Sequence, residues 1–150
     1  MPQDEPFLIA IGGFEPRPGL ATLRFQWLAV RSFRQARHAK GVRHADAMRR
    51  GRTYFSLTVW ETASAMKAYA TSGAHLEAMR AAGSLARASR FHRYWAAGVP
   101  DWPTALAAWD AAGRAEDKTG PTGASFGVEA SDQGSPPQGT AAPLLARELR

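Results

Sequence analysis

The chain has 150 residues, 45% of them hydrophobic, and a net charge of +6 at neutral pH. This length suits one domain with a core of its own. Cysteine is absent, which excludes disulfides, thiolate catalysis and cysteine-ligated zinc or iron–sulfur sites. The polar opening Met-Pro-Gln-Asp-Glu does not resemble a signal peptide, and no apolar run approaches the roughly 20 residues that cross a bilayer. We therefore expect a cytoplasmic protein with no membrane partner.

Arginine and lysine gather between residues 24 and 52, where Asp46 is the only carboxylate. Such a cluster suits nucleic acid, an anionic membrane surface or an acidic small molecule, and it equally suits a solvated helix face. The aromatic residues within it have helical spacing, as packing groups do, rather than the arrangement of a base-stacking platform. Nucleic acid is therefore the disfavoured partner.

The first elements are a strand and a long helix. The apolar run Phe7–Phe14 ends at a Pro-Arg-Pro-Gly breaker and predicts a buried strand. Its Gly12-Gly13 pair indicates a bulge or a close approach of another group to the backbone. From Leu20 to Lys40, an apolar stripe with arginines opposite predicts an amphipathic helix that ends at Gly41. The stripe consists of Leu20, Leu23, Trp27 and Val30, widened by Phe25, Leu28 and Phe33.

Residues 42–48 and 53–60 predict two strands joined as a hairpin through Arg49-Arg50-Gly51. In the second strand Phe55, Leu57 and Val59 share one face, and bulky groups also occupy the other. A central strand covered on both sides is therefore expected.

The second half of the domain predicts two short helices, a strand and a final helix. Thr62 is expected to cap a helix that ends near residues 71–73, and a second helix follows from Ala74 to about Ala82, closed by Gly83. Ser89–Ala97 alternates as a fourth strand, and a short helix begins near Pro103. Residues 114–150 are rich in Gly, Pro, Ser and Ala, which predicts a disordered tail after a domain of residues 1–113.

This order predicts an α+β fold of ferredoxin-like βαββαβ type, with a four-stranded antiparallel sheet and its helices on one face. The other face is too apolar to stay wet, whether it carries Phe55, Leu57, Val59, Phe91 and Trp95, or instead Tyr54, Trp60, His92 and Tyr94. Sheet-to-sheet packing in a two-fold homodimer would cover it, with help from the helix that begins near Pro103.

One segment resembles a known family. Arg52 to Glu61, a strand ending in Trp-Glu, leads into a helix at residues 63–69 and then a Ser-Gly-Ala-His turn at residues 72–75. This order is similar to the dimeric α/β-barrel superfamily, specifically antibiotic-biosynthesis-monooxygenase-like proteins and, closest, their spheroidene-monooxygenase-like branch. The resemblance covers residues 7 to 98.

The resemblance implies a monooxygenase-like oxidoreductase for a flat apolar or aromatic molecule, using haem or no cofactor. A non-catalytic small-molecule or haem-binding module of the same fold is the alternative. The resemblance favours His75 as a proton shuttle, or as the metal ligand if haem is bound. A helix-capping role for His75 is the simpler interpretation. The expected substrate-binding residues are Trp60, Tyr54, Trp27, His92 and Arg52, of which the aromatic groups are equally expected in the core or an interface.

Other chemistries lack a signature. No histidine pair has the spacing of a zinc site, and the Gly12-Gly13 pair lacks the third glycine of a dinucleotide-binding loop. The Gly-Ala-Ser-Phe-Gly segment at residues 123–127 falls in the expected tail rather than on a strand-to-helix elbow. Hydrolase and nucleotide-binding functions are therefore not indicated.

Overall fold

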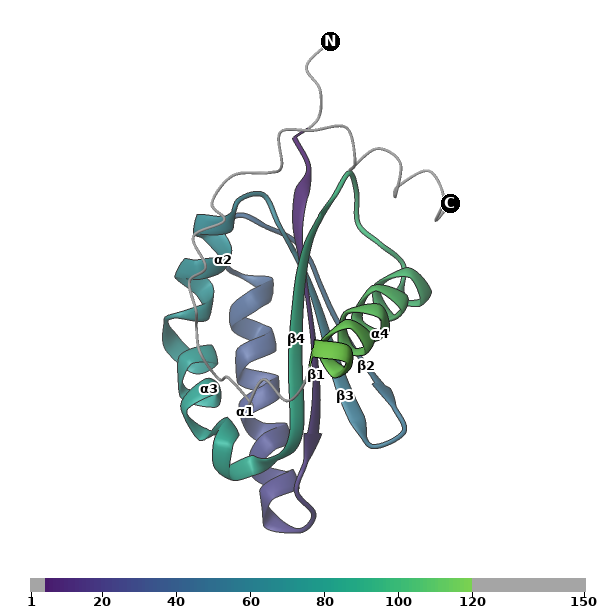
Figure 1. Ribbon diagram of the computed structural model, residues 1–150. Helices are drawn as coiled ribbons and strands as arrows, with labels where there is room; N and C mark the ends of the chain where they lie inside the picture. The colour runs from purple at the N-terminus through teal and green to yellow at the C-terminus, as the bar shows by residue number, and fades with distance from the viewer. Residues whose placement is uncertain (1–4, 120–150) are drawn as a thin grey trace.

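The computed structural model describes residues 5–119, with side chains to residue 115. The elements run β1 (Phe7–Pro16), α1 (Leu20–Arg37), β2 (Val42–Arg50), β3 (Thr53–Trp60), α2 (Ala63–Ala70), α3 (Gly73–Leu85), β4 (Ala86–Ala96) and α4 (Trp102–Thr119) (Figure 1). All strand pairs are antiparallel, in the order β2-β3-β1-β4. The predicted ferredoxin-like α+β fold is confirmed. No helix between residues 5 and 119 has both the length and the hydropathy to cross a membrane.

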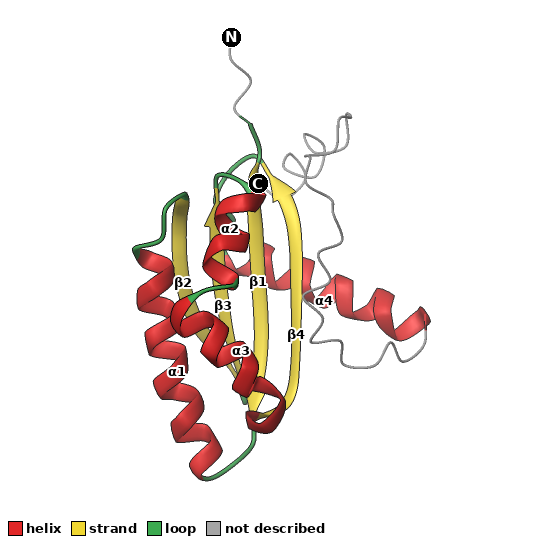
Figure 2. Ribbon diagram, turned by 90° about the vertical axis from the view of Figure 1, so that its left-hand side faces the viewer, coloured by secondary structure: helices red, strands yellow, loops and turns green. Residues whose placement is uncertain are grey.

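The sheet lies between two helical layers. Helices α1, α2 and α3 cover one face, and α4 crosses the other (Figures 1 and 2). We call these the α1–α3 face and the α4 face. Asp101 caps α4 by accepting a 2.9 Å hydrogen bond from the backbone N–H of Thr104, which satisfies one of the orphan donors of the first turn.

Strand register assigns each side chain to a face. Gly12 of β1 pairs with Ser56 on one side and with Phe91 on the other, and Leu8 likewise pairs with Trp60 and Trp95. Directly paired residues point to the same face of a sheet. Phe91 and Trp95 therefore share the α1–α3 face with Trp60, and the expectation that they group with Phe55, Leu57 and Val59 is wrong.

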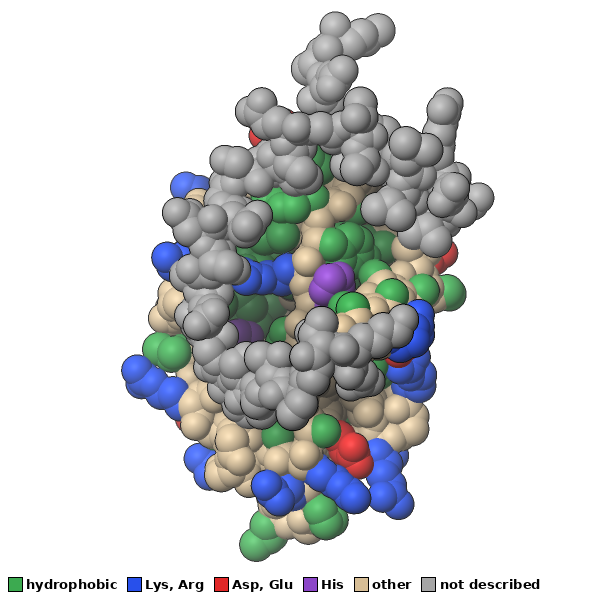
Figure 3. Space-filling model, in the orientation of Figure 1, with side chains coloured by type: hydrophobic (Ala, Val, Ile, Leu, Met, Phe, Trp, Pro, Cys, Tyr) green, Lys and Arg blue, Asp and Glu red, His purple; other side chains and the backbone are tan. Residues whose placement is uncertain are grey.

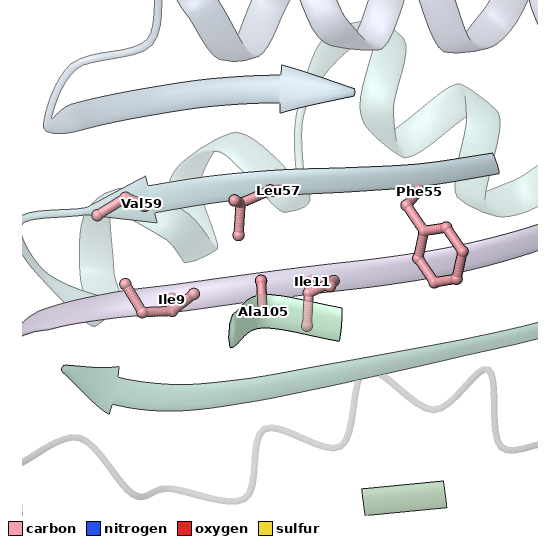
Figure 4. Close-up of a cluster of buried hydrophobic side chains, with 6 residues drawn as sticks. All are labelled: Ile9, Ile11, Phe55, Leu57, Val59 and Ala105. Atoms are coloured by element: carbon pink, nitrogen blue, oxygen red, sulfur yellow. The ribbon is translucent and has the colours of Figure 1, made fainter. Parts of the chain in front are cut away.

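The α4 face holds the main core. Its buried cluster consists of Ile9, Ile11, Phe55, Leu57, Val59 and Ala105 (Figure 4). Trp109 of α4 meets Phe55 edge-on, with ring centroids 4.9 Å apart. These apolar groups are thus buried within one chain, by α4. The expectation that Phe55, Leu57 and Val59 need a second copy to cover them is therefore wrong. Dimerisation itself stays a prediction.

Helix α1 turns four residues of its predicted apolar stripe away from the sheet. Its buried residues are Leu28, Ser32 and Ala36, whereas Leu20, Leu23, Trp27 and Val30 are all more than half exposed. The predicted stripe therefore divides. Leu28 is buried and Phe25 stacks on Phe14 of β1 with ring centroids 4.4 Å apart, as expected, whereas the four exposed residues face outward, contrary to expectation. Ser32 and Ala36 complete the inner side, where small residues allow close packing.

Several boundaries differ from expectation. Helix α1 ends at Arg37, and Gly41 instead occupies the following turn with φ of 82°. Helix α3 continues through Gly83 to Leu85. Helix α4 extends to Thr119, past the expected domain end at residue 113. Most of the predicted tail lies outside the described residues.

Candidate functional site

An aromatic cluster forms where β3 ends, beneath the junction of α2 and α3. Trp60, the last residue of β3, is fully buried. Tyr69 of α2 stacks on the Trp60 indole with ring centroids 5.0 Å apart and an interplanar angle of 27°. His75, in the first turn of α3, lies against Tyr69 with centroids 4.5 Å apart. The cluster links Trp60 and His75, two predicted site residues, through Tyr69, which the sequence analysis did not single out.

Local capping builds the junction that carries His75. The Thr62 hydroxyl accepts a hydrogen bond from the Ala65 N–H and starts α2, as predicted. Gly73 has φ of 57°, which permits the sharp break between α2 and α3 because glycine has no side chain to clash. The glycine also leaves room for the amide of Gln35, whose Oε1 would lie 3.0 Å from a Cβ at this position.

Gln35 of α1 ties the junction to the helical layer. Its amide nitrogen donates to the carbonyl of Ser72 at 2.9 Å, and more weakly to that of Tyr69 at 3.3 Å. Its amide oxygen accepts from the backbone N–H of His75 at 2.8 Å. One side chain thereby satisfies the backbone on both sides of the helix break, which positions the His75 ring.

The surroundings of His75 determine its protonation. Its Nδ1 lies 3.0 Å from the carbonyl oxygen of Ala70, which can only accept, so Nδ1 carries the hydrogen and donates it. Nε2 then holds a lone pair. Burial lowers the pKa of His75, only partly offset by the bond to Ala70. His75 is therefore a neutral imidazole with a basic Nε2, for which the described residues supply no hydrogen-bond donor.

The polar groups next to His75 are hydrogen-bonded, with the exception of the Ser32 hydroxyl. The Tyr69 hydroxyl donates to the Ser32 carbonyl at 3.3 Å, and burial raises the pKa of Tyr69, so its phenol stays protonated. The Trp60 N–H donates to the Thr58 hydroxyl at 2.8 Å. The Ser32 hydroxyl is buried and has no partner among the described residues, which is uncommon for a buried polar group.

Part of the α1–α3 face is open, although it lies on the helical side of the sheet. Figure 2 shows that α1 and α3 leave most of β4 uncovered. Ser56, on the central strand β3, is exposed, and Phe91 is 49% exposed. The Phe91 ring lies across Gly12, where an added Cβ would come within 2.6 Å of it. We call Gly12, Ser56 and Phe91 the open platform.

Figure 3 shows hydrophobic side chains on both sides of β4 at this edge of the molecule. The sequence analysis did not assign the open platform a binding role. Its one available signal was the Gly12-Gly13 pair, whose predicted close approach is confirmed: Phe91 lies against Gly12 and Trp109 against Gly13.

The remaining predicted site residues are dispersed. Tyr54 is at the opposite end of β3 from Trp60, beside Phe25 at 5.2 Å between ring centroids. Trp27 lies on the exposed side of α1, and Arg52 is exposed in the β2–β3 turn. His92 pairs with Ile11 and so lies on the α4 face, stacked on Tyr94 with centroids 5.5 Å apart. His92 and His75 therefore lie on opposite faces of the sheet, and the structure does not bring these two predicted site residues together.

The described surroundings of His75 give no support for haem, which the resemblance allowed. The imidazole packs against Tyr69, and its Nδ1 bond to a backbone carbonyl leaves Nε2 as the nitrogen that a metal would use. An axial ligand needs a porphyrin-sized space beside its other nitrogen. Two surface hollows, of about 400 and 720 Å³, are lined by other residues. No group of three or more metal-ligating side chains occurs among the described residues.

Comparison with known proteins gives similarity of structure only. No protein-family model matches the chain, and no curated protein does. Among solved structures, SnoaB from Streptomyces nogalater, a cofactor-independent oxygenase in its N63A form, is 14% identical with a TM-score of 0.50, over 59% of this chain and 90% of its own. Rv0793 from Mycobacterium tuberculosis is 20% identical with a TM-score of 0.54, over 59% and 92%. A proposed antibiotic biosynthesis monooxygenase from Nitrosomonas europaea is 11% identical with a TM-score of 0.52, over 58% and 95%. At these identities the likeness is one of fold.

Proposed function

Because the chain has the fold of the antibiotic-biosynthesis-monooxygenase-like, dimeric α/β-barrel proteins, we propose that it is a cofactor-independent oxidoreductase of that kind. Its substrate is a flat, electron-rich aromatic molecule that carries an acidic C–H or O–H. The observation that carries this proposal is the neutral His75 imidazole, with Nδ1 held by Ala70 and Nε2 basic. The spheroidene-monooxygenase-like branch stays a prediction.

The proposed substrate lies on the open platform. The exposed Phe91 ring offers an apolar stacking surface and Ser56 offers a hydroxyl at its edge. Ser56 and Trp60 are four residues apart on β3, about 13 Å, a length that a fused-ring molecule spans. Trp60, being fully buried, supports Tyr69 and His75 rather than the substrate itself.

The chemistry begins with proton transfer. His75 Nε2 accepts a proton from the substrate, since a neutral imidazole with a free lone pair can act as a general base. The resulting carbanion or phenolate is electron-rich enough to reduce O2 directly. One oxygen atom then enters the substrate carbon, converting CH2 to C=O, and the other leaves as water. Dioxygen is the sole oxidant, so the electrons balance without a cofactor.

Oxygen uptake with an anthrone-type substrate in the presence of a chelator tests this proposal. His75→Gln should lower kcat by about 10²- to 10⁴-fold, the range for losing a general base. The fold should persist because Gln35 holds the backbone, not the ring, of residue 75. His38, which is exposed and bonded only within α1's last turn, provides the control His38→Gln, and its kcat should be unchanged.

Substrate binding without oxygen uptake in the unaltered protein would instead identify a non-catalytic binding module. Equal kcat values for His75→Gln and the unaltered protein would remove His75 from the mechanism. The expected homodimer and cytoplasmic location belong to the same proposal, and sedimentation velocity of the purified chain tests the first of them.

A further inference from the structure

The outer side of α1 carries an apolar ridge with no covering element among the described residues. The ridge consists of Leu20, Leu23, Trp27 and Val30, which are 83%, 63%, 57% and 52% exposed. Spacings of three and four residues align them along one side of the helix. Only two other large hydrophobic residues in the described part are comparably exposed, and neither is on this helix. The exposed apolar groups are therefore concentrated on one helix.

The charges around the ridge have one sign. Helix α1 contains four arginines and no carboxylate in its 18 residues. Arg31 is paired with Glu77 at 2.7 Å and stacks over the Trp27 ring at 4.5 Å. The other three, Arg24, Arg34 and Arg37, have no ion-pair partner among the described residues. The ridge is thus an apolar strip bordered by cations.

A hollow of about 720 Å³ continues the ridge toward β2. Val30 belongs to both, and Phe33, Arg34 and Arg37 line the remainder together with His38. The hollow therefore combines apolar and cationic lining groups, as the ridge does. Its two arginines can bind the phosphate of a lipid headgroup.

We propose that the ridge docks this protein on an anionic lipid surface. An amphipathic helix with leucine and tryptophan on its apolar side and arginine beside it lies in the interface of such a bilayer. Tryptophan prefers this interface, and each nearby arginine gains from the negative surface potential. Trp27 and Arg31 together present both kinds of contact at one point.

Charge argues against the other occupants. A second copy packed ridge to ridge would bring like arginines together, which opposes the contact. Nucleic acid would contact the arginines but would leave the apolar ridge exposed to solvent, since Trp27 is the only aromatic residue of the ridge on which a base could stack. Surface docking needs no membrane-spanning segment. The inference is also independent of the proposed oxidoreductase function, because no ridge residue belongs to the His75 cluster or to the open platform.

Co-sedimentation of the full chain with vesicles tests the proposal. Binding should occur with phosphatidylserine-containing vesicles and not with phosphatidylcholine alone, and added salt should weaken it. Tryptophan emission should shift to the blue on binding, because Trp27 is the most exposed of the five tryptophans, and Trp27→Phe should remove the shift.

Paired variants separate the ridge from general surface effects. Leu23→Glu should weaken binding about tenfold or more, and Arg34→Glu at least about fivefold. The controls place the same changes elsewhere: Val99→Glu at a 48% exposed position, and Arg87→Glu in β4. Both controls should bind as the unaltered protein does, and all four should melt at similar temperatures.

Three outcomes would overturn the proposal: no binding to anionic vesicles, equal binding to neutral vesicles, or equal weakening by the controls. A dimer that Leu23→Glu dissociates, without vesicle binding, would assign the ridge to a second copy. Retained binding to a nucleic-acid homopolymer by Leu23→Glu, again without vesicle binding, would assign the surface to nucleic acid.

Discussion

The packing of α4 on its own sheet makes a sharp prediction at Gly13. A Cβ at this position would lie 2.6 Å from one Trp109 ring carbon and 2.9 Å from a Phe55 ring carbon. Trp109 cannot move aside easily. Its ring lies 3.6 Å from the Arg90 guanidinium, and its N–H donates to the Arg90 carbonyl at 3.2 Å. Gly13→Ala should therefore force α4 away from the core.

The neighbouring Gly12 offers a matched control. A Cβ there would come 2.5 Å from Phe91, but that ring is half-exposed and can rotate outward. Overpacking a well-filled core costs about 1–3 kcal/mol, and replacing a strand glycine by alanine returns about 0.5–1 kcal/mol. At Gly13 both Trp109 and Phe55 are in the way, so the upper part of this cost, about 2–3 kcal/mol, applies and Gly13→Ala should lose about 1–2.5 kcal/mol net. At Gly12 the glycine return offsets the cost of rotating Phe91, and Gly12→Ala should change stability by about 0.5 kcal/mol or less.

Urea unfolding followed by circular dichroism measures both variants. The loss in Gly13→Ala corresponds to a fall in Tm of about 5 °C or more for a domain of this size. If Gly13→Ala is as stable as the unaltered protein, or Gly12→Ala is the less stable of the two, then Trp109 does not occupy the space above Gly13 and the description of the α4 face is incorrect.

Three further predictions concern single contacts. Thr62→Ala should cost about 1 kcal/mol in urea unfolding because α2 loses its cap, whereas Thr62→Ser should not. The indole N–H of Trp102 bonds to the Asp46 carboxylate at 2.9 Å and, as the largest cause, lowers the pKa of Asp46. Stability from this contact is present above the ordinary pKa of 3.8 and is lost as pH falls through the lowered one; Trp102→Phe should flatten that acid limb, and an unchanged limb would contradict the assignment. Burial lowers the pKa of His75 from 6.5, so only the unfolded chain binds this proton just below pH 6.5 and stability should fall there as pH drops. His75→Gln should remove that slope, measured as Tm against pH.

Local elements followed closely from the sequence because local interactions decide them. The predicted strand at residues 53–60 is β3 between the same two residues, since its alternating aromatic and β-branched side chains favour extended backbone. The Thr62 cap was likewise predicted and is present. A cap depends on only a few neighbouring residues, all of them visible in the sequence.

Faces were harder to predict than elements. Strand β4 carries large apolar groups on both faces, Phe91 and Trp95 on one and Tyr94 on the other, so alternation alone does not show which face turns inward. A one-residue change in register would exchange them. In α1 only Leu28 of the predicted stripe is buried, together with the small residues Ser32 and Ala36, which allow close helix packing.

The candidate site shows the same division. The resemblance pointed to His75 and Trp60, but Tyr69 joins them only through stacking across two elements. Gln35, which contacts this junction from α1, is forty residues from His75 in sequence. The separation of His92 from this cluster likewise depends on pairing across β1 and β4.

By itself, then, the sequence determined the order of strands and helices, the absence of any cysteine chemistry and the concentration of positive charge between residues 24 and 52. These properties belong to short stretches of chain or to composition. The tertiary structure decided that α4 rather than a second copy buries Phe55 and Leu57, that the α1 ridge faces outward, and that His75 is neutral with a basic Nε2. Each of these depends on which distant groups come into contact, because burial and hydrogen-bond partners are set by packing and not by neighbours in the chain.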